Sequence, residues 1–188
     1  MLSGPDLELA GQPTSQVPPM PDAPVLLVVD DDPQTRSLVT GELRKRYGSD
    51  YRVICVDSAD DPLGLLAQLR HERRLVSIVL TGPSMSQTTA TELLAGVREF
   101  HRTAKRLLLT GWAYGPPQEP ILQAIALGHI DAYAAGPAAV PDEVFHLTVT
   151  ELLEKWARSH IPRSEACGWW ARSGLPARMR SGTWRAAT

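Results

Sequence analysis

The sequence has little cysteine and no long apolar run, and both features narrow the class of protein. Its 188 residues include 2 cysteines, Cys55 and Cys167, which lie far apart and favour reduced thiols over a disulfide framework. The first residues carry acids but no Lys or Arg, which argues against a signal peptide. No apolar run is long enough to cross a bilayer. We therefore expect a cytoplasmic protein with no membrane partner.

Several motifs that would indicate an enzyme are also missing. A Gly-x-Gly-x-x-Gly phosphate loop, a Cys-x-x-Cys redox pair, a Gly-x-Ser-x-Gly elbow and a His-Glu-x-x-His zinc site are all absent, and the 5 histidines are scattered. The formal net charge of -2 gives no global attraction to nucleic acid. The sequence thus offers no standard catalytic or cofactor site.

What the chain does contain is a regular alternation of apolar and amphipathic segments. The short apolar runs predict strands at 25–29, 51–56, 75–80, 106–110 and 130–135. Apolar residues at helical spacing predict helices at 34–47, 60–73, 89–101, 121–127 and 141–158. Alternating strands and helices form right-handed βαβ units, with helices on both faces of a parallel sheet. We expect a flavodoxin-like, doubly wound five-stranded sheet, with the strand order 2-1-3-4-5 taken from fold analogy.

The two ends of the chain differ in composition from this domain, which we place at residues 24–158. Residues 1–23 are rich in Pro and predict a flexible leader. Residues 159–188 form a basic tail in which Arg is interleaved with Trp. The tail could contact nucleic acid by charge and stacking, or dock on a protein surface, or be a partly ordered appendage.

Three carboxylates follow the first predicted strand. Asp32, with Pro33 after it, is the expected N-cap of the next helix. Asp30 and Asp31 are not explained by capping. The crevice of an open α/β sheet lies at the carboxyl ends of its strands, so these two residues predict an acidic pocket there.

Three strand ends resemble those of the response-regulator receiver (CheY-like) family. They read Val28-Val29-Asp30-Asp31, Leu108-Leu109-Thr110 and Tyr133-Ala134-Ala135-Gly136-Pro137. The resemblance implies a domain that accepts a phosphoryl group on an Asp after its third strand, with Mg²⁺ and a Lys beside it. It also implies that Thr110 and Tyr133 are switch positions. Each has a plainer alternative: Thr110 as a strand-end hydroxyl, and Tyr133 as a core aromatic.

The two reacting positions of the family are glycines in this chain. Gly82 falls at the acceptor position and Gly136 at the lysine position, and no Asp or Glu occurs between residues 75 and 91. The resemblance therefore points to a pseudo-receiver, a non-enzymatic module of a two-component phosphorelay system that binds a protein partner. The expected contact surface is the fourth helix, fifth strand and fifth helix. No cofactor is expected beyond a weak Mg²⁺ held by Asp30 and Asp31.

Other hypotheses stay open. A misaligned loop would leave another acid to serve as the acceptor, and the basic tail would suit a nucleic-acid-binding regulator. A narrower resemblance is to bacterial proteins that fuse a receiver to a thioredoxin-reductase-like module. The matching segments are Asp30-Asp31-Asp32-Pro33, Leu43-Arg44-Lys45-Arg46-Tyr47-Gly48 and Leu153-Glu154-Lys155-Trp156. The chain would then be the remnant of such a fusion.

Overall fold

Five parallel strands form one sheet in the order β2-β1-β3-β4-β5, which confirms the predicted topology. The computed structural model describes residues 22–82, 85–86, 88–111, 119–137 and 142–160. The strands are β1 (Val25–Val29), β2 (Arg52–Val56), β3 (Val76–Thr81), β4 (Lys105–Thr110) and β5 (Ala132–Ala135). All residues of β1 and β3 are buried, because both strands are central in the sheet and covered on both faces.

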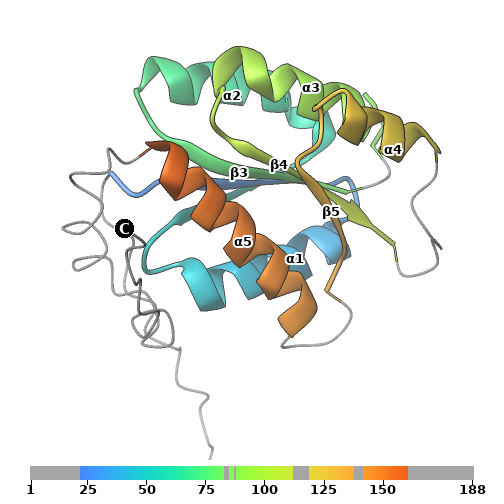
Figure 1. Ribbon diagram of the computed structural model, residues 1–188. Helices are drawn as coiled ribbons and strands as arrows, with labels where there is room; N and C mark the ends of the chain where they lie inside the picture. Colours follow the sequence, from blue (N-terminus) through green and yellow to red (C-terminus); the bar gives the residue numbers. More distant parts are fainter. Residues whose placement is uncertain (1–21, 83–84, 87, 112–118, 138–141, 161–188) are drawn as a thin grey trace, which may run out of the picture.

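Helices cover both faces of the sheet (Figure 1). On one face lie α1 (Pro33–Tyr47) and α5 (Glu143–His160), and on the other α2 (Pro62–His71), α3 (Ala90–Phe100) and α4 (Glu119–Ala126). Side chains alternate along β1: Leu26 and Val28 join the core under α1 and α5. The other β1 side chains join the core under α2, α3 and α4. The doubly wound architecture thus rests on two separate apolar cores.

The helix ends follow the signals in the sequence. Asp32 is the N-cap of α1 with Pro33 at its start, so that prediction is confirmed. Gly after a helical pattern is a typical stop signal, and Gly48 is the C-cap of α1. The acids that follow β2 cap two elements. Asp57 caps the 3-10 helix η1 (Ser58–Asp60), and Asp61 caps α2.

The inner face of α5 differs from the prediction. The apolar spacing of residues 141–158 predicts that Val144, Leu147, Leu152 and Trp156 face the core. Leu152 and Trp156 are buried, together with Phe145 and Val149, but Val144 and Leu147 are 75% and 61% exposed. The reason is the helical phase: residues 145, 149, 152 and 156 share one stripe, whereas 144 and 147 lie roughly 110° and 170° around the helix from it.

Other boundaries shift by a few residues. Strand β3 extends to Thr81 and leaves Leu75 outside it at 44% exposed, and α5 continues to His160. Cys55 is a free, exposed thiol on β2. None of the described helices is long and apolar enough to span a bilayer. Residues 1–21 of the predicted leader, Pro141, Cys167 and the tail from residue 161 lie outside the described residues.

Candidate functional site at the carboxyl edge of the sheet

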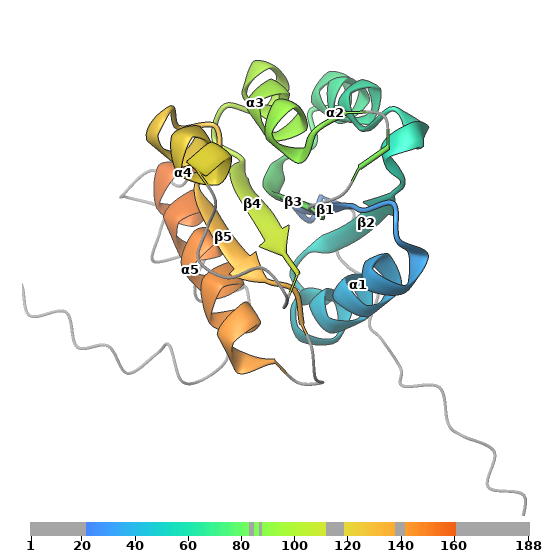
Figure 2. The ribbon, with the colours of Figure 1, turned by 90° about the vertical axis from the view of Figure 1, so that its right-hand side faces the viewer.

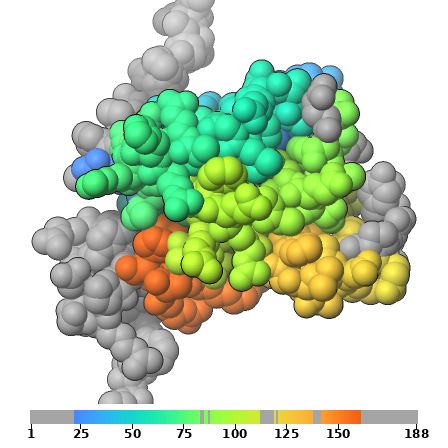
Figure 3. Space-filling view, turned by 90° about the horizontal axis from the view of Figure 1, so that it is seen from above, coloured from blue at the N-terminus to red at the C-terminus, as the bar shows by residue number. Residues whose placement is uncertain are grey.

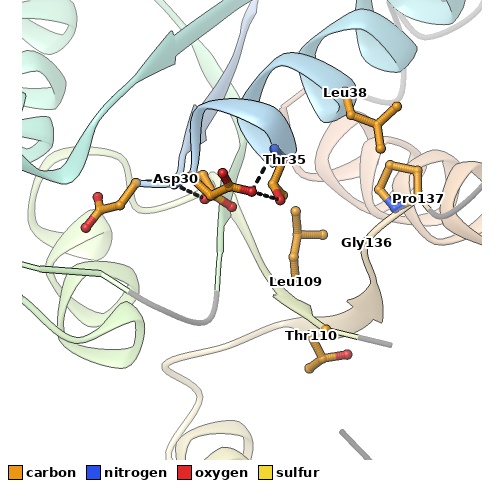
Figure 4. A pocket seen from close by; sticks show the side chains of 10 residues that line it. Asp30, Thr35, Leu38, Leu109, Thr110, Gly136 and Pro137 are labelled. Atoms are coloured by element: carbon orange, nitrogen blue, oxygen red, sulfur yellow. Dashed lines mark hydrogen bonds between the residues drawn. The ribbon is translucent and has the colours of Figure 1, made fainter. Parts of the chain in front are cut away.

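The carboxyl ends of β1, β4 and β5 lie at one edge of the sheet (Figure 2) and surround an open cleft of about 550 Å³ (Figure 4). It is lined by Asp30, Asp31, Asp32, Thr35, Leu38, Leu109, Thr110, Gly111, Gly136 and Pro137. The fold therefore brings together four of the predicted site residues: Asp30, Asp31, Thr110 and Gly136. The wall formed by Leu38, Leu109 and Pro137 was not predicted. The apolar spacing of α1 predicts Leu38 on its inner side, but this residue is 37% exposed.

Asp30 is a buried carboxylate, and only one of its two oxygens has a hydrogen-bond partner among the described residues. Its side chain is 3% exposed, and Oδ1 accepts a hydrogen bond of 2.9 Å from the backbone N–H of Asp32. Oδ2 is buried and has no hydrogen-bond partner among the described residues. Burial raises the pKa of Asp30, and the charges of Asp32 and Asp31 raise it further. The protonated form of Asp30 is thus favoured relative to an exposed carboxyl.

Asp31 is turned toward two loops. Its Oδ1 accepts a hydrogen bond of 3.0 Å from the backbone N–H of Ser58, and its Oδ2 accepts one from the N–H of Ser86. Burial raises the pKa of Asp31, but the hydrogen bonds from Ser58 and Ser86 together outweigh it and lower the pKa to about 2. Asp31 therefore ties the segments after β2 and β3 to the end of β1.

Asp32 caps the N-terminus of α1. Its two oxygens accept hydrogen bonds from the backbone N–H groups of Gln34 and Thr35, at 3.2 and 3.0 Å. Hydrogen bonds from Thr35 lower the pKa of this exposed carboxyl. The three adjacent acids thus have three different structural partners.

A cation that the sequence analysis missed lies beside this cluster. Arg36 donates through Nη1 to the backbone carbonyl of Asp30, and the same nitrogen is 3.1 Å from Oδ2 of Asp57. Its charge opposes the rise in the pKa of Asp30. The only sequence signal was its place one turn into the helix that Asp32 caps. Nothing in the sequence pointed to Ser58 or Ser86.

Gly82, at the end of β3, sits against the carboxylate of Asp30. Its backbone N–H donates to the carbonyl of Val29 at 3.0 Å. A Cβ atom at position 82 would lie 2.2 Å from Oδ2 of Asp30, well inside van der Waals contact. Asp30 therefore occupies the space that any side chain at position 82 would need.

Gly136, at the end of β5, has the opposite surroundings. A Cβ atom there would meet no described atom within 4 Å, because it would point into open space. Gly136 lines the cleft, whereas Gly82 does not. The two glycines thus differ in how easily they would accept a side chain.

The two predicted switch residues stand on the neighbouring strands β4 and β5 and differ in their surroundings. Thr110 lines the cleft and donates through Oγ1 to the carbonyl of Ala134 at 3.3 Å, which fits a strand-end hydroxyl as well as a switch residue. Tyr133 is 43% exposed on β5, so it is not a core aromatic with only its hydroxyl at the surface. The role of both as switch positions stays a prediction.

Comparison with solved structures identifies this arrangement. The signal receiver domain of an HD domain-containing protein from Pseudomonas fluorescens is 25% identical with a TM-score of 0.59, covering 74% of this chain and 95% of that one. The response regulator TrrA from Thermotoga maritima, solved with Mg²⁺ and BeF, is 23% identical with a TM-score of 0.51, covering 69% and 99%. Both matches show that this chain has the fold of a receiver domain.

The domain has the fold of a response-regulator receiver (CheY-like) domain. A curated protein, the hydrogenase transcriptional regulatory protein HoxA of Cupriavidus necator, is 30% identical over 129 residues. Those residues are 69% of this chain, which spans only 24% of HoxA. No family model matches the sequence.

The donor set of this receiver domain fits Mg²⁺ poorly. Among the described residues, no group of three or more His, Cys, Asp or Glu side chains could hold a metal ion. Asp31 already accepts two backbone N–H groups, and Oδ2 of Asp30 lies against Gly82. The weak Mg²⁺ site stays a prediction, and we derive no step through a metal.

Asp30 and Asp31 have opposite surroundings, so removing their charges should have opposite effects on the free energy of unfolding. Asp31→Asn should lower the free energy of unfolding at pH 7 by about 1 to 2 kcal/mol, because a charged acceptor of two N–H bonds is lost. This difference from the wild type should be complete above the ordinary carboxyl pKa of 3.8 and disappear as the pH falls toward 2. Asp30→Asn should leave stability equal or higher at pH 7, because the buried charge is removed. Urea denaturation across this pH range measures both, and equal losses for the two variants would contradict the assignment.

The two glycines give a second matched comparison. Gly82→Ala should lower the free energy of unfolding by about 1 to 3 kcal/mol, because the new Cβ displaces the Asp30 carboxylate. Gly136→Ala should be neutral or stabilising by up to about 1 kcal/mol, because its Cβ meets open space. Adding Asp30→Ala should recover most of the loss caused by Gly82→Ala. Additive losses in that double variant, measured by urea denaturation, would show that Asp30 is not the obstacle.

Proposed function

We propose that this receiver domain is a pseudo-receiver, a regulatory module of a two-component system that binds a protein partner without being phosphorylated. The observation that carries the proposal is Gly82. It stands at the end of β3 beside the acidic pair and has no side chain to phosphorylate. The place that a nucleophilic side chain would take is filled by Oδ2 of Asp30, 2.2 Å from the Cβ position.

The charges around the cleft support the same conclusion. Phosphoryl transfer needs a cation to offset the charge that develops on the phosphoryl oxygens. Gly136 supplies none. The nearby Arg36 is held by the Asp30 carbonyl and the Asp57 carboxylate. Both oxygens of Asp31, the second member of the acidic pair, accept backbone N–H groups from the loops after β2 and β3.

Incubation with acetyl phosphate and Mg²⁺ tests the absence of phosphorylation. We expect no increase in intact mass that hydroxylamine removes, since an acyl phosphate needs a carboxylate at the acceptor position. A conventional receiver domain treated in parallel serves as the positive control. A stoichiometric adduct on the wild-type chain would overturn the proposal.

The surface formed by α4, β5 and α5 supports the proposed contact with a protein. Five large apolar side chains of this region are exposed: Leu122, Leu127, Tyr133, Val144 and Leu147. Two of them, Val144 and Leu147, lie on the same side of α5 and are the most exposed. Exposed apolar residues gathered on neighbouring elements are typical of a protein-binding surface.

Charge substitution on this surface tests the contact. Leu147→Glu should abolish capture of a partner from a lysate of the source organism, because a carboxylate is not tolerated in an apolar interface. Leu75→Glu, which changes a 44% exposed leucine directly before the central strand β3, should leave capture intact. Mass spectrometry of the bound proteins reads out both variants. Equal capture by the wild type and Leu147→Glu would contradict the proposed surface.

Two alternatives remain as proposals. HoxA is named as a transcriptional regulatory protein, and this likeness favours an output in gene regulation. The thioredoxin-reductase fusion rests on the sequence resemblance alone.

A further inference from the structure

The net charge of the chain conceals a strong separation of charge between the two edges of the sheet. Acids gather at the carboxyl edge, where strands end and helices begin: Asp30, Asp31, Asp32, Asp57, Asp61 and Glu92. Arg36 is the one Lys or Arg of the described residues at that edge. All other described Lys and Arg residues come from the last two turns of helices, the first residues of strands or the loops that join them.

The opposite edge of the sheet therefore carries a basic surface, on the left in Figure 1, where α5 ends and β1 begins. We call it the basic edge and define it by six exposed residues: Arg44, Lys45, Arg52, Arg73, Arg102 and Arg158. Figure 3 views the molecule over α2 and α3, whose last turns lead to this edge. Sequence reasoning from net charge missed this surface, because the acids at the other edge cancel it in the total.

Helix dipoles account for only part of this arrangement. Cations at the C-terminal ends of helices are favourable, which covers Arg44, Lys45 and Arg158. Arg73 and Arg102 follow the last residues of α2 and α3 by two positions, so the same effect covers them. Arg52, which begins β2, is the one of the six that no helix end accounts for.

Acids at this edge do not neutralise the six cations. Asp22 pairs with Arg74 at 3.7 Å, and Asp131 pairs with the buried Arg106 at 2.9 Å. Asp50, Glu72 and Glu99 lie near Arg52, Arg73 and Arg102 in the chain, but none of the ion pairs found among the described residues joins them to these cations. Lys and Arg outnumber Asp and Glu at this edge, so its surface carries a net positive charge. A polyanion is the complementary ligand.

The chain continues from this edge into its most basic segment. Helix α5 ends at His160, and residues 161–188 then contain five Arg, three Trp and a single Glu. The basic edge is thus continuous in the chain with a segment able to pair with phosphates and stack on bases.

We propose that the basic edge binds the phosphate backbone of a nucleic acid. Five of its six cations are Arg, whose planar guanidinium can donate two hydrogen bonds to one phosphate. The acidic carboxyl edge repels the same polyanion, so only the basic edge can approach it. This leaves the cleft and the surface of α4, β5 and α5 open to a protein, and the inference stands independently of whether Gly82 prevents phosphorylation.

Fluorescence anisotropy of the full chain with a labelled 20-nucleotide DNA, single-stranded and duplex, tests the proposal. Binding should weaken steeply between 50 and 200 mM NaCl, because phosphate contacts release counterions. Arg52→Gln with Arg102→Gln should weaken binding by about tenfold or more at 100 mM NaCl and reduce the salt slope by about 2. Both residues are exposed.

A variant of equal net charge provides the control. Gln34→Glu with Gln123→Glu also changes the charge by two units, but on exposed residues of α1 and α4 away from the basic edge, and should bind like the wild type. Circular dichroism checks folding, and Arg44→Gln with Lys45→Gln replaces the first pair if that variant unfolds. Three results would overturn the proposal: no binding to either DNA, equal weakening by both charge variants, or binding only to vesicles of phosphatidylserine and phosphatidylcholine.

Discussion

The burial of a carboxylate at the end of the central strand is the constraint on which the site depends. The apolar strand β1 lies between two cores and delivers Asp30, Asp31 and Asp32 together to one edge of the sheet. Three adjacent negative charges repel each other, so each needs its own partner. Asp31 accepts hydrogen bonds from two backbone N–H groups, and Asp32 caps the start of α1. One oxygen of Asp30 has no hydrogen-bond partner among the described residues.

That unpaired oxygen links the acidic cluster to Gly82. A residue without a side chain at position 82 leaves room for the carboxylate of Asp30, and a larger residue there would have to displace that carboxylate. Gly136 leaves the cleft open without such a mutual fit. The two glycines therefore have different structural meanings. Gly82 packs against the Asp30 carboxylate, whereas Gly136 leaves open space in the cleft.

The separation of charge gives the molecule two distinct ends. Acids at helix starts and cations at helix ends both complement the helix dipoles, and the parallel sheet aligns every such pair in the same direction. The exposed apolar residues of α4, β5 and α5 form a third region between these ends. A protein partner and a polyanion could therefore bind the same domain without competing for one surface.

The sequence by itself determined the alternation of strands and helices, the helix caps and the place of the acids at a strand end, because these depend on local periodicity and on short-range hydrogen bonds. Asp32 as N-cap and Gly48 as C-cap follow from neighbouring residues alone. The tertiary structure decided which face of α5 is buried, since Phe145 and Val144 differ by one position and only packing against the sheet selects between them. It also decided the partners of Asp31, and it placed Asp30 against Gly82, 52 residues away in the chain. Contacts between segments so far apart depend on how the sheet aligns its strands, which no local pattern encodes.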